Sequence, residues 1–173
     1  MFVRLSAAVA AICLLSPIAY AAGAAPTDPQ IAHIAYTAGV IDIEAAKQAV
    51  KISKNKEVVD FAKDMLRDHE AVNQQALALV KKLKVTPEDN NTSRELTKAA
   101  AAERDKLAKL KGAKFDKAYI ENEVAYHKQV NGALETVLIP SAQNAELKDL
   151  LETGLKVFQG HEQHAEHVAA MLK

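Results

Sequence analysis

Four ionisable side chains interrupt the apolar faces of the helices that this sequence predicts. His69 stands at the centre of one such face, and His161 stands on another. Glu123 and His127 are four residues apart, so on a helix they project from the same side. Imidazole and carboxylate groups that meet inside a helical bundle suit a transition metal such as Zn, Cu, Fe or Ni better than Mg or Ca. The pattern predicts one such ion in the core and no organic cofactor.

Each of these residues also has an ordinary structural explanation. A core histidine can be neutral and hydrogen-bonded to a Tyr or Glu side chain, and a Glu can extend along the side of a bundle. His164 and His167 fall in the last turns of the final helix, where the helix dipole favours histidine without a metal. Glu44 lies roughly 100° from the centre of the first apolar stripe, which by pattern alone indicates a solvated side chain.

Five helices and no strand are predicted to position these groups, because apolar residues recur at steps of three and four. The expected ranges are 28–52, 55–83, 92–112, 115–138 and 142–172. Short turns join the first helix to the second and the fourth to the fifth, so each pair forms an antiparallel hairpin. The predicted fold is all-α: a ferritin-like four-helix bundle of two antiparallel hairpins, with a short extra helix in the crossover. An up-down bundle of five helices is the alternative.

Counting residues from the two hairpin turns indicates which side chains can meet. At a rise of ~1.5 Å per residue, Glu123 and His161 differ by ~3 Å in height along the bundle axis, which we call their level. His127 and His161 differ by ~9 Å. Glu44 and His69 differ by a similar ~8–9 Å. The offset between the second and fourth helices is hidden by the crossover, so Glu123 with His161 is the pair we expect to be in contact.

The sequence lacks the motif of a ferritin-type di-iron centre. Such centres use Glu-x-x-His on two helices. The residues three positions before the histidines are Gln30, Leu66, Val124, Phe158, His161 and His164, and none of them is Glu. The sequence therefore argues against dinuclear oxidase chemistry.

Composition and the N-terminal segment limit the class of protein. Lys and Arg number 22 and Asp and Glu number 22, so the chain lacks the basic excess of a nucleic-acid binder. Arg4, an apolar run to Tyr20 and Ala-x-Ala patterns predict a cleaved signal peptide at 1–24 and a bundle domain at 25–173. A membrane anchor is the alternative, which Pro17 and the short run disfavour. The mature chain has no cysteine and no predicted transmembrane segment, which indicates a periplasmic protein.

Several stretches of the sequence resemble a known family. They are Ile43-Glu44-Ala45-Ala46-Lys47, Val59-Asp60-Phe61-Ala62-Lys63-Asp64-Met65 with Asp68-His69, Phe115-Asp116-Lys117-Ala118-Tyr119 with His127, and His161. In this order and spacing, over about residues 29–172, they are similar to the bacterial exported family named domain of unknown function 4142, in the ferritin-like superfamily. The resemblance implies an envelope-exported bundle with matching polar positions at Glu44, His69, Asp116, Tyr119, His127 and His161.

The run from Phe115 to His127 is also similar to a sister family of His- and Met-rich exported bundles, some of which bind copper. That family has a His pair where this sequence has Tyr126-His127, and the mature chain has only Met65 and Met171. A thioether-rich copper site is therefore not expected. The resemblance adds Glu44 to the predicted ligands, which are His69, Glu123, His127, His161 and Glu44.

Three functions are compatible with these observations. The leading hypothesis is a periplasmic bundle that binds a transition metal for metal handling or envelope stress, without turnover. The alternative is a non-catalytic structural or partner-binding envelope protein with a buried His/Glu network. A metal-dependent oxidase or peroxide scavenger is less favoured. The partner is left open between an envelope protein and a second copy of the chain.

Overall fold

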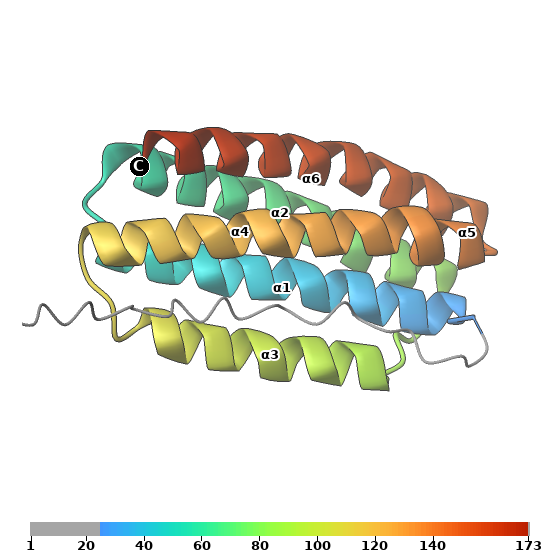
Figure 1. Ribbon diagram of the computed structural model, residues 1–173. Helices are drawn as coiled ribbons and strands as arrows, with labels where there is room; N and C mark the ends of the chain where they lie inside the picture. The colour runs from blue at the N-terminus through green and yellow to red at the C-terminus, as the bar shows by residue number, and fades with distance from the viewer. Residues whose placement is uncertain (1–24, 173) are drawn as a thin grey trace, which may run out of the picture.

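The stretches with apolar steps of three and four residues are helical in the computed structural model, which describes residues 25–172 (Figure 1). The predicted signal peptide at 1–24 lies outside the described residues. The elements are α1 (Asp28–Ile52), α2 (Lys56–Leu83), α3 (Asn91–Leu107), α4 (Ala113–Ala133), the π-helical turn η1 (Leu134–Leu138), α5 (Ile139–Ser141) and α6 (Ala145–Met171). No strand occurs in the described residues, so the all-α prediction is confirmed.

The first hairpin pairs α1 with α2, which run antiparallel and pack against each other. Asn55 begins α2, because its side-chain oxygen accepts hydrogen bonds from the backbone N–H groups of Glu57 and Val58 at 3.0 and 3.3 Å. In the turn just before, the hydroxyl of Ser53 donates a hydrogen bond to the buried carboxylate of Asp116 in the first turn of α4. The turn of the first hairpin is therefore tied to the start of the second.

The second hairpin pairs α4 with α6, and its first arm continues from α4 through η1 into α5. At η1 the backbone N–H of Ile139 donates to the carbonyl of Leu134, five residues earlier. The prediction of an uninterrupted α-helix over 115–138 was wrong at this turn. Pro140 lies in the next turn and has no N–H to donate, so a regular i→i−4 ladder cannot be complete there.

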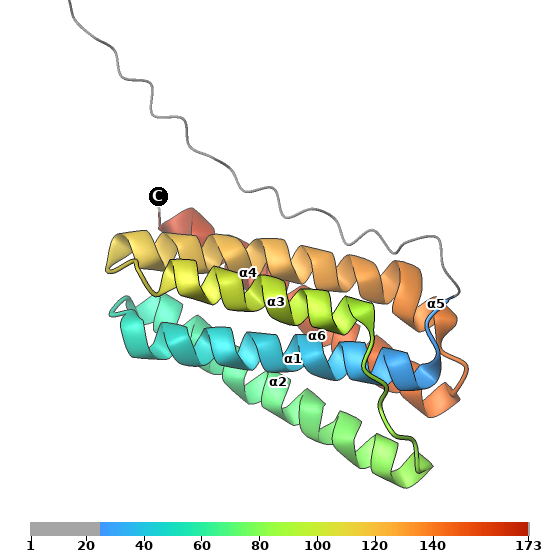
Figure 2. The ribbon, with the colours of Figure 1, turned by 90° about the horizontal axis from the view of Figure 1, so that it is seen from below.

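Helix α3 occupies the crossover between the two hairpins. The chain leaves α2 at one end of the bundle, returns along α3 and enters α4 at the other end, so α2 and α4 point the same way (Figure 1 and Figure 2). Helix α3 packs on α1 and α4, outside the four-helix core. Two antiparallel hairpins joined by a long crossover are the ferritin-like arrangement. The predicted bundle is confirmed: the five long helices alternate in direction, but α3 packs outside the four-helix core instead of joining it.

Two apolar clusters fill the interior of the bundle. One lies toward the turn between α1 and α2 and includes Phe61, Met65 and Phe115, all fully buried. The other lies toward the loop between α5 and α6 and includes Ile31 and Leu151. Between these clusters each of the four long helices carries at least one buried ionisable residue. These residues form the polar belt: Asp42, His69, Glu123, His127 and His161. The apolar clusters therefore hold the helices on both sides of a polar belt.

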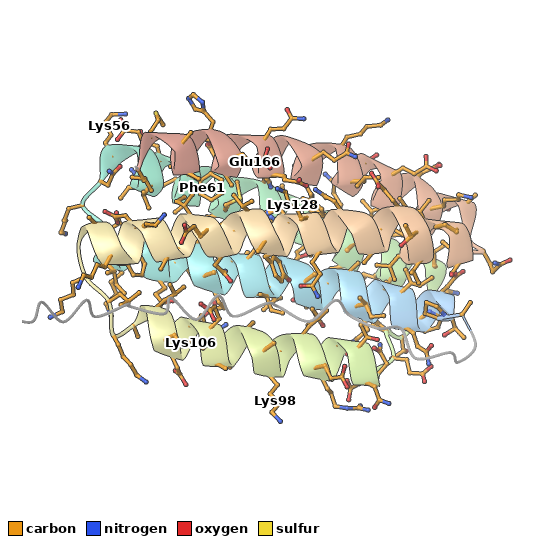
Figure 3. The ribbon with its side chains drawn as sticks, viewed as in Figure 1. Lys56, Phe61, Lys98, Lys106, Lys128 and Glu166 are labelled. Carbon is orange, nitrogen blue, oxygen red and sulfur yellow. The ribbon has the colours of Figure 1, made fainter. Side chains whose placement is uncertain are left out.

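Charged side chains cover the outside of the bundle (Figure 3). Lys128 of α4 pairs with Glu166 of α6 at 2.6 Å, while Lys98 extends from α3 into solvent. Such exposed pairs contribute little to stability, so the apolar clusters carry most of it. Among the described helices, none has the length and apolar character needed to cross a bilayer.

Candidate metal centre

Three histidines from three helices meet in the polar belt. His69 comes from α2, His127 from α4 and His161 from α6, and only 2%, 1% and 6% of their surfaces are exposed. The ring centroid of His69 lies 5.8 Å from that of His127 and 5.1 Å from that of His161. The centroids of His127 and His161 lie 5.5 Å apart. One ring nitrogen of each histidine lies within 4.8 Å of those of the other two. The three side chains can therefore share one ion.

Hydrogen bonds fix the tautomers of two of these rings. Nδ1 of His127 lies 3.0 Å from the backbone carbonyl of Glu123, which can only accept, so this nitrogen carries the proton. Nε2 of His161 lies 3.0 Å from the carboxylate of Asp68 and donates to it. The opposite nitrogens, Nε2 of His127 and Nδ1 of His161, are buried without a hydrogen-bond partner. Their lone pairs are free, which is how a carbonyl or carboxylate partner prepares histidine for a metal.

His69 is held by packing instead of hydrogen bonds. Its ring stacks on Phe158 of α6, with centroids 4.6 Å apart and planes 9° apart. Neither ring nitrogen has a hydrogen-bond partner, and Nε2 lies 3.5 Å from a carboxylate oxygen of Asp42. A buried imidazole with two unpartnered nitrogens costs free energy in the metal-free protein. No hydrogen bond fixes the tautomer of His69, so either nitrogen, one at a time, can offer its lone pair to a ligand.

Burial keeps all three histidines neutral. It lowers the pKa of His69 well below the ordinary value of 6.5, and the neighbouring His127 and His161 lower it further. Burial also lowers the pKa of His127 to about 4. The pKa of His161 is lowered by burial, against the opposing effect of Asp68. Metal ions bind neutral imidazole, so the cluster is in the binding-competent protonation state at neutral pH.

A buried pair of carboxyl groups, Asp42 of α1 and Glu123 of α4, lies beside the histidines. One carboxyl oxygen of each acid and one ring nitrogen of His127 all lie within 4.8 Å of one another. Burial raises the pKa of Glu123 to about 8. Burial, and then the adjacent Glu123, raise the pKa of Asp42 well above 3.8. No Lys or Arg within residues 25–172 forms an ion pair with either group, and the metal-free pair therefore retains protons at neutral pH.

The structure brings together four of the five residues that the sequence predicts as ligands. His69, His127 and His161 form one group, and Glu123 lies at 3.7 Å from His127. Glu123 groups with Asp42 and His127, whereas the sequence paired it with His161. Levels within one hairpin say nothing of the neighbouring hairpin, which supplies Asp42, so this carboxyl partner of Glu123 was not predicted.

Glu44 does not join the cluster, and this prediction needs correction. Its side chain is 46% exposed and forms an ion pair with Lys47 at 3.2 Å. Asp42 takes the place on α1 that the sequence assigned to Glu44. The signal was present, because Asp42 lies four residues after Ala38 and three before Ala45, on the buried stripe of α1. Asp68, which orients His161, was also missed as a functional position, since its place at the edge of α2 indicates a surface side chain.

The remaining histidines lie outside the cluster. The ring of His164 packs edge-on against Phe61, with centroids 5.2 Å apart, and His167 is exposed. His33 lies far along α1, with Nδ1 at 2.9 Å from the hydroxyl of Ser93 on α3. These contacts agree with the structural explanation that the sequence gave for His164 and His167.

The fold and the cluster define a helical bundle of two hairpins with a buried His/carboxylate centre. The chain belongs to the family DUF4142, a domain of unknown function, whose family model matches residues 15–168. Its structure is similar to the crystal structure of a DUF305 protein of Streptomyces coelicolor, described as secreted, with a TM-score of 0.70 and 11% sequence identity. The match covers 83% of this chain and 91% of that chain. At this identity the likeness concerns the fold alone. No curated protein is similar to the chain in sequence.

Proposed function

We propose that this protein is an exported bundle that binds a transition-metal ion at His69, His127 and His161, for metal handling or the response to envelope stress. The observation that carries the proposal is the meeting of three buried histidines from three helices, each with one ring nitrogen within 4.8 Å of those of the other two and each with an unpartnered ring nitrogen. Three neutral imidazoles suit Zn, Cu, Fe or Ni. Three protein ligands also leave one coordination position for an exchangeable molecule, which suits uptake and release.

The periplasm is the proposed compartment. The arrangement of Arg4, the apolar run and the Ala-x-Ala patterns in residues 1–24 supports export through a cleaved signal peptide. The similar fold of the Streptomyces protein described as secreted also supports it. The mature chain would be free of cysteine, because its one cysteine, Cys13, lies in the removed segment. Imidazole is then the softest abundant ligand that the protein can offer to a metal.

Thermal unfolding with and without metal tests the proposal. The chain from residue 25, without an affinity tag, should melt at a higher temperature when Zn(II), Cu(II) or Ni(II) is added, because only the folded state assembles three helices around the ion. At a free ion concentration of ~100 Kd the gain is about 2.7 kcal/mol. For a domain of this size that corresponds to a rise of roughly 5–10 °C. Excess chelator should reverse it.

Two variants separate the core site from the histidines in the last turns of α6, His164 and His167, which we call the C-terminal histidine run. His69→Ala should abolish the stabilisation, because that ligand is on α2, far along the chain from the run. The double variant His164→Ala with His167→Ala should retain it, since neither residue belongs to the cluster. Loss of binding in the double variant together with full binding in His69→Ala would show that no core site exists. A structural or partner-binding bundle with a buried polar network would then be the better description.

A further inference from the structure

We propose that Asp42 and Glu123 form a second cation site, next to the three-histidine site, for a divalent ion that prefers carboxylate oxygen, such as Mn(II). The proposal extends the proposed function from one ion to two adjacent ions. It depends on the proposed function only through His127, which borders both groups. Its chemistry differs from that of the first site, because two carboxylates dominate the donor set.

The first argument is the burial of two acids against each other. Asp42 and Glu123 are 3% and 1% exposed and come from neighbouring helices. One carboxyl oxygen of each lies within 4.8 Å of the other and of a ring nitrogen of His127. Removing a carboxylate from water costs several kcal/mol unless a counter-charge compensates it. His69 lies 3.5 Å from Asp42 and His127 lies 3.7 Å from Glu123, and neither acid forms an ion pair with a Lys or Arg of the described residues. Among residues 25–172 the ionised pair would thus have no Lys or Arg as a counter-charge, and a bound cation that displaces the protons of the acids would supply one.

The second argument is the presence of unpartnered oxygen atoms around the pair. Oε2 of Glu123 is buried and has no hydrogen-bond partner. The hydroxyl oxygen of Tyr119, one turn earlier on the same face of α4, is also buried and unpartnered. Unpartnered carboxylate oxygen is the kind of donor that a hard divalent ion takes, and the phenol beside it can donate a hydrogen bond to such a site.

The third argument is the two-sided position of His127. A ring nitrogen of His127 lies within 4.8 Å of both the histidine group and the carboxyl group, and its Nδ1 lies 3.7 Å from a carboxylate oxygen of Glu123. One group is rich in nitrogen and the other in oxygen, so the two sites should select different metals. Zn(II) should prefer the histidines, and Mn(II), the weakest binder of nitrogen among these ions, should prefer the carboxylates.

Titration of the metal-free mature chain with Mn(II), followed by the electron paramagnetic resonance signal of free Mn(II), tests the second site. Wild-type protein should bind one Mn(II) per chain. Asp42→Asn should weaken Mn(II) binding by more than about tenfold while leaving the zinc-dependent rise in melting temperature. His161→Ala should do the reverse, because His161 belongs to the histidine group and not to the carboxyl group. Glu44→Gln, on the same helix as Asp42 but exposed, is the matched control and should bind Mn(II) normally.

The outcomes distinguish the second site from the first. Circular dichroism melting of each metal-free variant verifies that it folds, and Glu123→Gln repeats the test from the other helix. If wild-type protein leaves Mn(II) free while zinc still stabilises it, the second site does not exist and the proposed function stands. Equal Mn(II) affinity in Asp42→Asn and wild type overturns the assignment to this pair. If His161→Ala abolishes both ions, a single mixed site replaces the two. If zinc never binds and Mn(II) binding needs Asp42, the proposed function fails and the carboxylate site stands.

Discussion

Glu123→Gln should make the stability of the metal-free protein less sensitive to rising pH. Burial on α4 raises the pKa of Glu123 from 4.5 to about 8. Between these values the folded state keeps a proton that the unfolded state has released. The stability that this proton contributes is fully present below pH 4.5 and is lost as the pH rises through 8. A glutamine has nearly the same shape and does not titrate, so the variant lacks this loss.

The magnitude follows from one proton. A difference of one bound proton changes the free energy of unfolding by about 1.4 kcal/mol per pH unit. From pH 5.5 to 7.5, wild-type protein should therefore lose about 2.7 kcal/mol relative to Glu123→Gln. The titratable groups close to Glu123 are Asp42 on α1 and Tyr119, Tyr126 and His127 on α4. All of them remain in both proteins, and burial still holds the proton of Asp42, so their contributions largely cancel in the comparison.

Urea unfolding by circular dichroism, in chelator at pH 5.5, 6.5 and 7.5, measures this difference. Glu44→Gln is the control, because it makes the same chemical change at an exposed position, and it should follow wild type. A gap between wild type and Glu123→Gln that stays constant with pH would refute the reasoning. Glu123 would then ionise in the folded protein as it does in the unfolded chain, and the cost of its burial would have been overestimated.

Two further predictions concern His127 and the N-terminus. The pKa of His127 is lowered to about 4, so its contribution to stability is present above pH 6.5 and is lost as the pH falls toward 4. Wild type should lose about 1.4 kcal/mol more per pH unit than His127→Gln between pH 6 and 5 in the same urea assay; equal slopes would contradict burial of a neutral ring. Intact-mass measurement of the exported protein should place its N-terminus between Ala22 and Pro26, whereas a mass that retains residues 1–20 would exclude cleavage.

The helices of the fold were predictable because their signals are local. Asn55 and Asn144 accept hydrogen bonds from the first N–H groups of α2 and α6, as residues of this type do at helix starts. The short links between the helices of each hairpin then leave antiparallel packing as the simple solution. The π-helical turn at Leu134–Leu138 could not be predicted in the same way, because it depends on how one arm of the second hairpin packs around Pro140.

The site was predictable only in part, because its members come from both hairpins. His69 and His161 were recognisable, since each breaks an apolar stripe. Asp42 breaks the stripe of α1 equally well, but a carboxylate next to Ile41 and Ile43 is ordinarily solvated, and its partner Glu123 lies 81 positions away. Only the offset between the hairpins shows that these two acids meet. That offset is set by side-chain packing along α1 and α4 and has no local sequence signal.

The polar belt also bears on how the proposed ion would be handled. Six buried polar atoms of His69, Tyr119, Glu123, His127 and His161 have no hydrogen-bond partner among residues 25–172. Each such atom costs about 1–3 kcal/mol, and a belt of apolar residues would avoid that cost. The apolar clusters on both sides pack the four helices together, and under the proposed function they would hold the bundle folded without an ion. A small structural zinc domain, by contrast, is unfolded without its metal. Under the proposed function, ligands that are already assembled in a folded bundle can take up and release an ion without unfolding, which a protein that handles metals requires.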